Sequence, residues 1–194
     1  GWLFHAEAGH YEQAWRLLTQ ENPLPAVMGR VCYHPCETAC NRGELDECVG
    51  INAIERFLGD EALRHGWKFE APPPASGKRV LVVGAGPSGL SAAYHLARFG
   101  HAVTIREAGP VAGGMMRFGI PKYRLPREVL DGEVQRILDL GVRLELNSKV
   151  TNVLEAMRSG SFDAVFLAVG AHIAKRAYIP AGSASKMLDA DSVL

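Results

Sequence analysis

The sequence has no excess of either charge, no long apolar run and few cysteines. Lysine plus arginine and aspartate plus glutamate each number 21, which argues against a wholly basic nucleic-acid binder and against an acidic tail protein. No apolar stretch approaches the ~20 residues that a membrane-spanning helix needs. Four cysteines in 194 residues are too few for a disulfide scaffold. The chain starts at Gly1, inside an amphipathic pattern and without a signal-peptide layout, so we interpret it as a piece of a longer protein.

The balanced charge conceals an uneven distribution. Residues 1–70 carry 11 acidic and 6 basic side chains, whereas residues 71–194 carry 10 and 15. Three consecutive prolines within residues 71–77 cannot continue a helix, and they predict a short, stiff, extended connector. We therefore expect two differently built units, residues 1–70 and residues 78–194.

The first unit is expected to be helical. Apolar side chains recur at helical spacing in residues 10–20 and 51–65, and a cysteine-bearing loop is expected between these helices. A unit of this size buries little core, and such units often need a metal or a partner to stay folded.

The second unit alternates strand and helix patterns. Short apolar runs predict strands at residues 79–83, 102–106, 142–146 and 164–169, with helices at residues 87–99, 126–140 and 150–158. This alternation indicates a parallel sheet with right-handed crossovers. The predicted fold class is α + α/β, a small helical domain followed by a Rossmann-like βαβ domain.

A glycine motif between the first strand and helix of this unit predicts a dinucleotide site. Gly84, Gly86 and Gly89 fit G-x-G-x-x-G, and the helix that follows directs free N–H groups and a positive dipole end at phosphates. Glu107 comes 18 residues after Gly89, where a carboxylate accepts hydrogen bonds from ribose hydroxyls. It would repel a 2′-phosphate, so NAD and FAD are the expected dinucleotides. The alternative is a glycine-rich tight turn with an incidental acid.

The long segment 109–126 favours FAD over NAD. It is rich in glycine, contains Arg117, Lys122 and Arg124, and is followed by Arg127. A loop this long is unusual in a plain NAD domain. In a flavoprotein such a segment wraps the pyrophosphate and the ribityl chain. A solvated basic loop is the alternative interpretation.

The cysteines indicate a metal or iron–sulfur site. Cys32, Cys36 and Cys40 follow one another at four-residue steps, and Cys48 lies eight residues further on. Structural zinc held by three cysteines and His34, disulfides, and inert buried thiols remain as alternatives.

Both units resemble the glutamate synthase small (β) subunit family of FAD/iron–sulfur oxidoreductases, and are also similar to the N-terminal part of dihydropyrimidine dehydrogenase. The motifs that resemble its iron–sulfur domain are Asn22-Pro-Leu-Pro, Gly29-Arg-Val-Cys32, His34-Pro-Cys36-Glu, Cys40-Asn-Arg-Gly43 and Ile54-Glu-Arg-Phe57. Those that resemble its FAD domain are Gly84-Ala-Gly-Pro-Ser-Gly89, Gly113-Gly114, Phe118-Gly-Ile-Pro121, Arg124-Leu-Pro126 and Asp163-Ala-Val-Phe-Leu-Ala-Val-Gly170.

The resemblance implies that electrons pass between NAD(P)H, FAD and two [4Fe–4S] clusters. By position, Cys32 and Cys36 would serve one cluster and Cys40 the other, whereas Cys48 has no counterpart. Glu55 stands where some relatives have a non-thiolate ligand; the alternative is an ordinary helix-surface acid. The implied FAD contacts are Gly84, Ala85, Gly86, Pro87, Ser88, Gly89, Glu107, Ala108, Gly113, Gly114, Met115, Arg124, Val150 and Gly170.

The resemblance also has departures. The family's further cluster cysteines have no counterparts here, Met28 stands where many relatives have cysteine, and the NAD(P)H domain would lie beyond Leu194, entered through residues 179–182. No side chain is assigned a catalytic role; His34, His101 and His172 are candidates, for which a loop or surface role is the favoured alternative.

The implied protein is a cytoplasmic electron-transfer module with a larger catalytic subunit as partner, with no nucleic-acid partner and no membrane span. Three alternatives stay open: the electron-transfer subunit of a different oxidoreductase complex, a non-catalytic metal-stapled assembly unit, and an NAD-linked enzyme without flavin.

Overall fold

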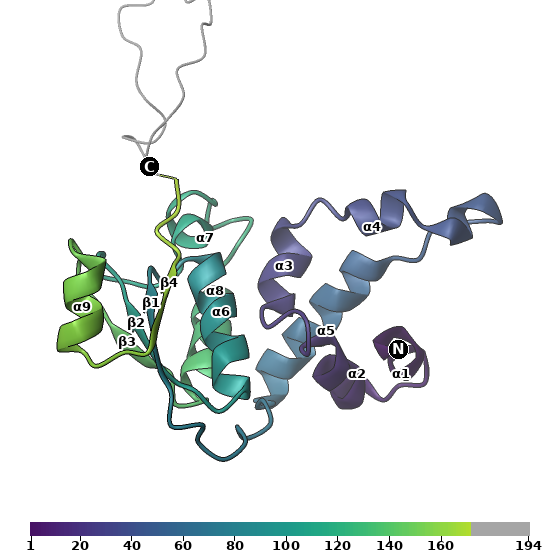
Figure 1. Ribbon diagram of the computed structural model, residues 1–194. Helices are drawn as coiled ribbons and strands as arrows, with labels where there is room; N and C mark the ends of the chain where they lie inside the picture. The colour runs from purple at the N-terminus through teal and green to yellow at the C-terminus, as the bar shows by residue number, and fades with distance from the viewer. Residues whose placement is uncertain (172–194) are drawn as a thin grey trace, which may run out of the picture.

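The computed structural model describes residues 1–171, in which a helical unit precedes a sheet with flanking helices (Figure 1). The predicted helices at 10–20 and 51–65 are confirmed, whereas the expected cysteine-bearing loop contains three short helical elements. Pro25 and Pro35 each begin one of them, because a first-turn residue needs no N–H partner. His172 and residues 179–182 lie outside the described residues. The helical elements are α1 (Trp2–Glu7), α2 (Tyr11–Leu18), α3 (Pro25–Val31), α4 (Pro35–Thr38), the 3-10 helix η1 (Asn41–Glu44) and α5 (Ile51–His65).

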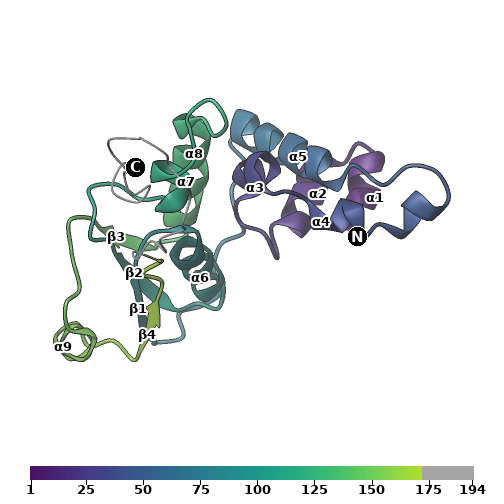
Figure 2. The same ribbon diagram turned by 90° about the horizontal axis from the view of Figure 1, so that it is seen from above.

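The second unit is a Rossmann-like fold. Its four strands are parallel and lie in the order β3-β2-β1-β4, which confirms the predicted parallel sheet. Helices α6 and α8 cover one face and α9 covers the other (Figure 2). The elements in chain order are β1 (Arg79–Val83), α6 (Pro87–Arg98), β2 (Ala102–Arg106), α7 (Met115–Phe118), α8 (Arg127–Leu138), β3 (Arg143–Glu145), α9 (Val153–Ser159) and β4 (Ala164–Leu167).

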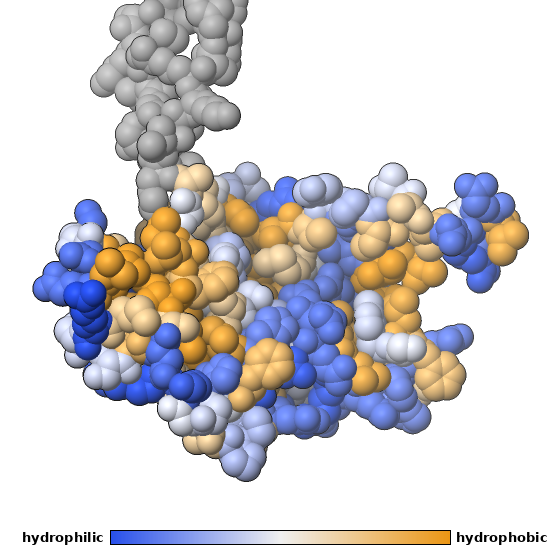
Figure 3. All heavy atoms as spheres, in the orientation of Figure 1, coloured by the Kyte–Doolittle hydropathy of each residue, from blue (hydrophilic) through white to orange (hydrophobic). Residues whose placement is uncertain are grey.

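The strand at one edge of the sheet carries exposed apolar side chains. Within residues 1–171, β4 pairs with β1 alone. Phe166, Leu167 and Val169 are partly exposed there, and apolar residues gather over this part of the surface (Figure 3). The face of the sheet that α6 and α8 cover carries most of the core.

The two units share that core. Leu24 and Val27 of the helical unit are buried in one cluster with Leu90 of α6 and Leu130 of α8. A second, smaller cluster inside the helical unit is centred on Trp15 and Leu58, both fully buried. The helical unit therefore gains burial from the Rossmann-like fold as well as from its own side chains.

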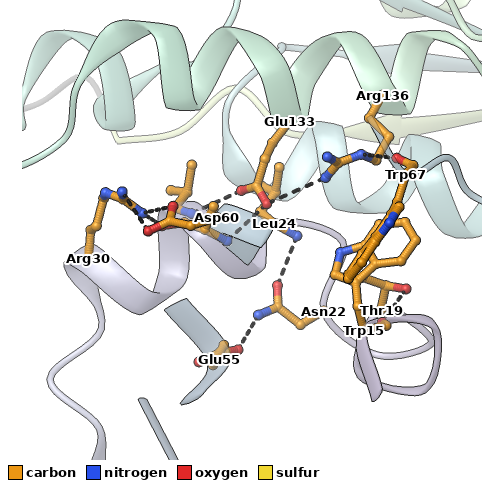
Figure 4. A network of polar contacts seen from close by, with 12 residues as sticks. Trp15, Thr19, Asn22, Leu24, Arg30, Glu55, Asp60, Trp67, Glu133 and Arg136 are labelled. Carbon is orange, nitrogen blue, oxygen red and sulfur yellow. Dashed lines mark hydrogen bonds and ion pairs between the residues drawn. The ribbon is translucent and has the colours of Figure 1, made fainter. Parts of the chain in front are cut away.

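A buried carboxylate on α8 joins the two units at the start of α3. Glu133 is fully buried, and its Oε1 and Oε2 accept hydrogen bonds from the backbone N–H groups of Ala26 and Val27, each at 2.9 Å (Figure 4). No side chain of the preceding N-cap residue caps α3. The first N–H groups of a helix have no partner within it, so Glu133 supplies the acceptors from the other unit.

One turn further along α8, Arg136 makes a second contact with the helical unit. Its Nε donates to the carbonyl oxygen of Trp67 at 2.9 Å, and its guanidinium lies 5.1 Å from the centre of the Trp15 ring (Figure 4). Two neighbouring positions of one helix thus hold different parts of the helical unit.

Burial raises the pKa of Glu133 from 4.5 to about 8, because the charged carboxylate has lost its water. The two N–H donors and the positive charges of Arg136 and Arg30 act in the opposite direction. The folded protein therefore holds a proton on this carboxyl at a pH where the unfolded chain has released it.

The other side of α3 approaches α5 through two glycines. A Cβ on Gly59 would lie 2.3 Å from the backbone nitrogen of Ala26, and a Cβ on Gly29 would lie 2.4 Å from the Cβ of Arg56. Each helix therefore has no side chain where the other comes closest, and α3 is held between α5 and α8.

The raised pKa of Glu133 predicts a pH-dependent stability. Folding takes up a proton between about pH 4.5 and pH 8, so this carboxyl's contribution to the free energy of unfolding is present at the acid end and is lost as the pH rises through this window. Glu133→Gln cannot titrate, and we expect its urea-unfolding free energy to lack this fall. Equal pH slopes for the two proteins would contradict the prediction.

Gly59→Ala is expected to destabilise the helical unit by about 1–3 kcal/mol, because the added methyl group forces α3 and α5 apart. Gly43→Ala is the matched control, since a Cβ there meets no atom within 4 Å, and its effect should stay within about 0.5 kcal/mol. Urea unfolding measures both, and equal losses would show that the close approach is not what Gly59 provides.

Candidate functional site

The turn between β1 and α6 contains two glycines that are required for packing. Gly84 has φ +105°, and a Cβ there would lie 2.3 Å from the carbonyl oxygen of Ala168. A Cβ on Gly89 would lie 1.9 Å from the carbonyl oxygen of Gly84. A side chain on Gly84 would disrupt the contact of the turn with the end of β4, and one on Gly89 would disrupt the packing of α6 against the turn.

Gly86 differs, because the space beside it is open. A Cβ there would find only the Cα of Gly114, at 3.9 Å. Helix α6 begins at Pro87 without a side-chain cap, so the N–H groups of its first turn are available to an anion. A pyrophosphate site at this turn stays a prediction from the sequence motif.

Glu107 lies at the carboxyl end of β2, beside the turn. Its Oε2 accepts from the N–H of Ala85 at 2.7 Å, and its Oε1 accepts from the N–H of Gly109 at 2.8 Å. The side chain therefore joins the loops that follow β1 and β2. An ionised carboxylate has about four acceptor positions, so two hydrogen bonds leave acceptor capacity for ribose hydroxyls.

The segment 109–126 folds back over the glycine turn. Gly113 donates its N–H to the carbonyl of Ala85 at 2.9 Å, and a Cβ on Gly114 would lie 2.8 Å from the Cα of Gly86. Both glycines have positive φ. Met115 follows at the start of α7 and is 57% exposed. This returning segment borders the space beside Gly86.

Three of the four basic side chains in or next to this segment make hydrogen bonds or ion pairs within the fold. Arg117 donates to the carbonyl of Ala112 and pairs with Asp131. Arg127 donates to the carbonyls of Met116, Leu125 and Ile120. Arg124 donates from Nε to the carbonyl of Arg30 at 3.3 Å. The segment is thus fastened to the fold, unlike a solvated basic loop.

The other predicted dinucleotide contacts are spread over several elements around the sheet. Ser88 and Ala108 are exposed, at the start of α6 and directly after Glu107. Val150 packs against the cluster of Leu81 and Val83, on the face that α9 covers. Gly170 follows β4 and has φ +74°.

The cysteines occupy separate short elements. Cys32 follows α3, and its Sγ accepts the N–H of His34 at 3.2 Å. Cys36 is exposed on α4, and Cys40 precedes η1. Backbone N–H groups of Val49 and Arg42 lower the pKa of the Cys40 thiol, which favours a thiolate.

These thiols fit iron–sulfur ligation by their chemistry, because thiolates that accept N–H donors are the usual ligands of such clusters. Residues 1–171 nevertheless gather no three His, Cys, Asp or Glu side chains placed to hold a metal. The described residues therefore offer single ligands and do not complete a cluster site.

The remaining predicted candidates have other partners. Glu55 on α5 is half-buried and accepts a hydrogen bond from the side-chain amide of Asn22, and burial raises its pKa. The ring of His34 lies 3.6 Å from the Glu37 carboxylate. His101 shares a 2.7 Å hydrogen bond with Ser76 of the proline-rich connector. A ligand role for Glu55 stays a prediction.

Sequence reasoning missed Glu133 and Arg136 as joining residues. Glu133 falls within the apolar stripe of α8, between Leu130 and Ile137 at helical spacing, and a charged residue in such a stripe is the available signal.

Comparison with known proteins defines the class of each unit. Residues 1–67 match the family "Dihydropyrimidine dehydrogenase domain II, 4Fe-4S cluster", and residues 82–159 match "NAD(P)-binding Rossmann-like domain". The chain is therefore a helical iron–sulfur domain followed by a Rossmann-like dinucleotide domain. Within residues 1–171, no helix is long and apolar enough to cross a membrane.

Three of the relatives are oxidoreductase subunits whose names contain NADP or NADPH. The chain is 42% identical over 87% of its length to the NADP(+)-dependent formate dehydrogenase subunit beta of Moorella thermoacetica. It is 41% identical over 85% of its length to the NADPH-Fe(3+) oxidoreductase subunit beta of Geobacter sulfurreducens, and 36% over 90% to the glutamate synthase [NADPH] small chain of Escherichia coli. It spans 27%, 25% and 38% of these relatives. The homology confirms the resemblance to glutamate synthase small chains.

Gly86→Ala and Gly89→Ala are expected to fail in different ways. Gly86 has φ −77° and open space beside it, so its alanine variant should fold normally but bind a dinucleotide about tenfold more weakly, or worse. Gly89→Ala should lose about 1–3 kcal/mol of stability, because its methyl group meets the Gly84 carbonyl. Thermal unfolding and titration with FAD and NAD separate the two effects. Normal dinucleotide affinity in the Gly86 variant would overturn this assignment.

Proposed function

We propose that this chain is the electron-transfer part of an NAD(P)H-dependent oxidoreductase, with FAD bound at the Gly86 turn and iron–sulfur clusters in the helical domain. The observation that carries the proposal is the open turn at Gly86, bordered by the uncapped start of α6, by Glu107 and by the returning Gly113–Gly114 segment. The proposed partner is a larger catalytic subunit in the cytoplasm.

The choice of FAD for this turn rests on Glu107 and on the returning segment. A carboxylate next to the ribose repels a 2′-phosphate, so NADP(H), after which some of the relatives are named, is a poor ligand for this turn. FAD carries an unphosphorylated ribose. The segment 109–126 offers backbone for the remainder of a long ligand, beyond what the ADP half requires.

The protein's own contributions are binding and orientation. The first turn of α6 would hold the pyrophosphate, Glu107 would accept hydrogen bonds from ribose hydroxyls, and Gly86 would let the backbone come close. Ala108, Gly113, Gly114, Met115, Arg124, Val150 and Gly170 remain proposed contacts. Bound FAD supplies the exchange between two-electron and one-electron chemistry. Cys32, Cys36 and Cys40 would each contribute a thiolate to clusters that need further ligands.

The absorbance spectrum of the full-length protein, purified without oxygen, tests the proposal. We expect flavin peaks above a broad iron–sulfur shoulder, and both FAD and iron on chemical analysis. Colourless protein that contains zinc would instead support a metal-stapled assembly unit.

Single cysteine variants sharpen this experiment. Cys36→Ser and Cys40→Ser should each lower the iron content and the shoulder while the flavin peaks remain, because the two cofactors lie in different domains. Cys48→Ser is the matched control, since this exposed cysteine has no assigned ligand role. Equal iron loss in the control would contradict the assignment of ligands.

A further inference from the structure

Helix α3 carries Cys32 at its end and takes its position from the other domain. Cys32 directly follows α3, and its N–H donates to the carbonyl of Met28 at 2.9 Å, so the residue moves with the helix. The helix has only seven residues, and a helix this short is not stable by itself. Its place is therefore set by what packs around it.

The Rossmann-like domain contacts α3 at both ends. At the start, Glu133 accepts the N–H groups of Ala26 and Val27. Near the end, Arg124 donates to the carbonyl of Arg30. The contact at the start is fully buried, whereas Arg124 is exposed, so Glu133 makes the stronger of the two.

The contacts of α3 within its own domain fix its distance to α5 and its rotation. Gly29 and Gly59 allow the close approach, and Arg30 pairs with Asp60 of α5 at 2.8 Å (Figure 4). A shift of α3 along α8 is opposed by the two hydrogen bonds of Glu133, because a carboxyl group whose two oxygens accept neighbouring N–H groups allows one register.

We propose that Glu133 is a positioning residue, which sets the place of α3, and through it of the Cys32 thiol, against the dinucleotide-binding domain. This role rests on the proposed function, since the place of Cys32 matters for electron transfer only if Cys32 is a cluster ligand. Glu133 touches neither Cys32 nor the Gly86 turn, so it acts on Cys32 through α3; its other charged contact is Arg136 of the same helix, at 3.9 Å.

Amide hydrogen exchange on the full-length protein tests the positioning without reference to any cofactor. In Glu133→Ala we expect exchange in residues 25–32 to be about tenfold faster or more, which corresponds to ~1.4 kcal/mol. Exchange in α9, which lies on the other face of the sheet, should not change. Glu133→Gln keeps a carbonyl acceptor and should restore most of the protection, and Gln135→Ala on the exposed side of α8 is the control.

Unchanged exchange in residues 25–32 of Glu133→Ala would overturn the proposal. If that variant fails to fold, Glu133→Asp takes its place, because the shorter aspartate side chain reaches at most one of the two N–H groups. Amide exchange in residues 25–32 of the aspartate variant should then be faster than in the wild type and slower than in a fully open helix. Wild-type exchange in the aspartate variant would likewise overturn the proposal.

A second readout separates positioning from general damage. After mixing with NAD(P)H without oxygen, flavin bleaching should keep its rate in Glu133→Ala, whereas bleaching of the iron–sulfur shoulder should slow, because electron transfer slows as the distance between the two cofactors increases. Equal slowing of both, or no rescue by Glu133→Gln, would refute a positioning role. Absence of iron from the wild type would refute the proposed function instead, while the exchange experiment still decides the docking of α3.

Discussion

One buried carboxylate holds the architecture together, because it satisfies a helix that has no cap of its own. Glu133 belongs to α8, which covers the sheet of the Rossmann-like domain, yet its two oxygens complete the start of α3 in the helical domain. An unpaired buried N–H group costs on the order of 1–3 kcal/mol, so a change at either partner is felt by both domains. The two domains also share the core around Leu24, Val27 and Leu130.

Close backbone approach through glycines is the second constraint, and it is found at both candidate sites. In the helical domain, Gly29 and Gly59 bring α3, which Cys32 directly follows, against α5, which carries Glu55. In the other domain, Gly89 brings α6 against its turn, and Gly114 brings the returning segment against Gly86. The absence of side chains at these glycines lets the loops and short helices pack closely against the rest of the fold.

The sequence predicted the Rossmann-like domain well because its signals are local. The β-branched strand at residues 79–83 and the glycine spacing that follows need no information from elsewhere in the chain. Helices α3 and α4 have seven and four residues, too few to show a helical period, and they were expected as loop. The contact between Glu133 and Ala26 joins residues 107 positions apart, and a single sequence does not reveal which partner a buried acid has. The same limit applies to Glu107, whose carboxylate was expected to face ribose and also fastens two loops.

The contact between Gly84 and Ala168 has a consequence for the order of assembly. The glycine turn leaves the ribosome long before β4, yet β4 must lie beside β1 for the Ala168 carbonyl to back that turn. The helices of the first domain also emerge before α8, which carries the acceptor for α3. Such non-local pairings form slowly, and unfinished domains expose apolar surface meanwhile. The packing of the glycine turn against β4 and of α3 against α8 is therefore completed only late in synthesis.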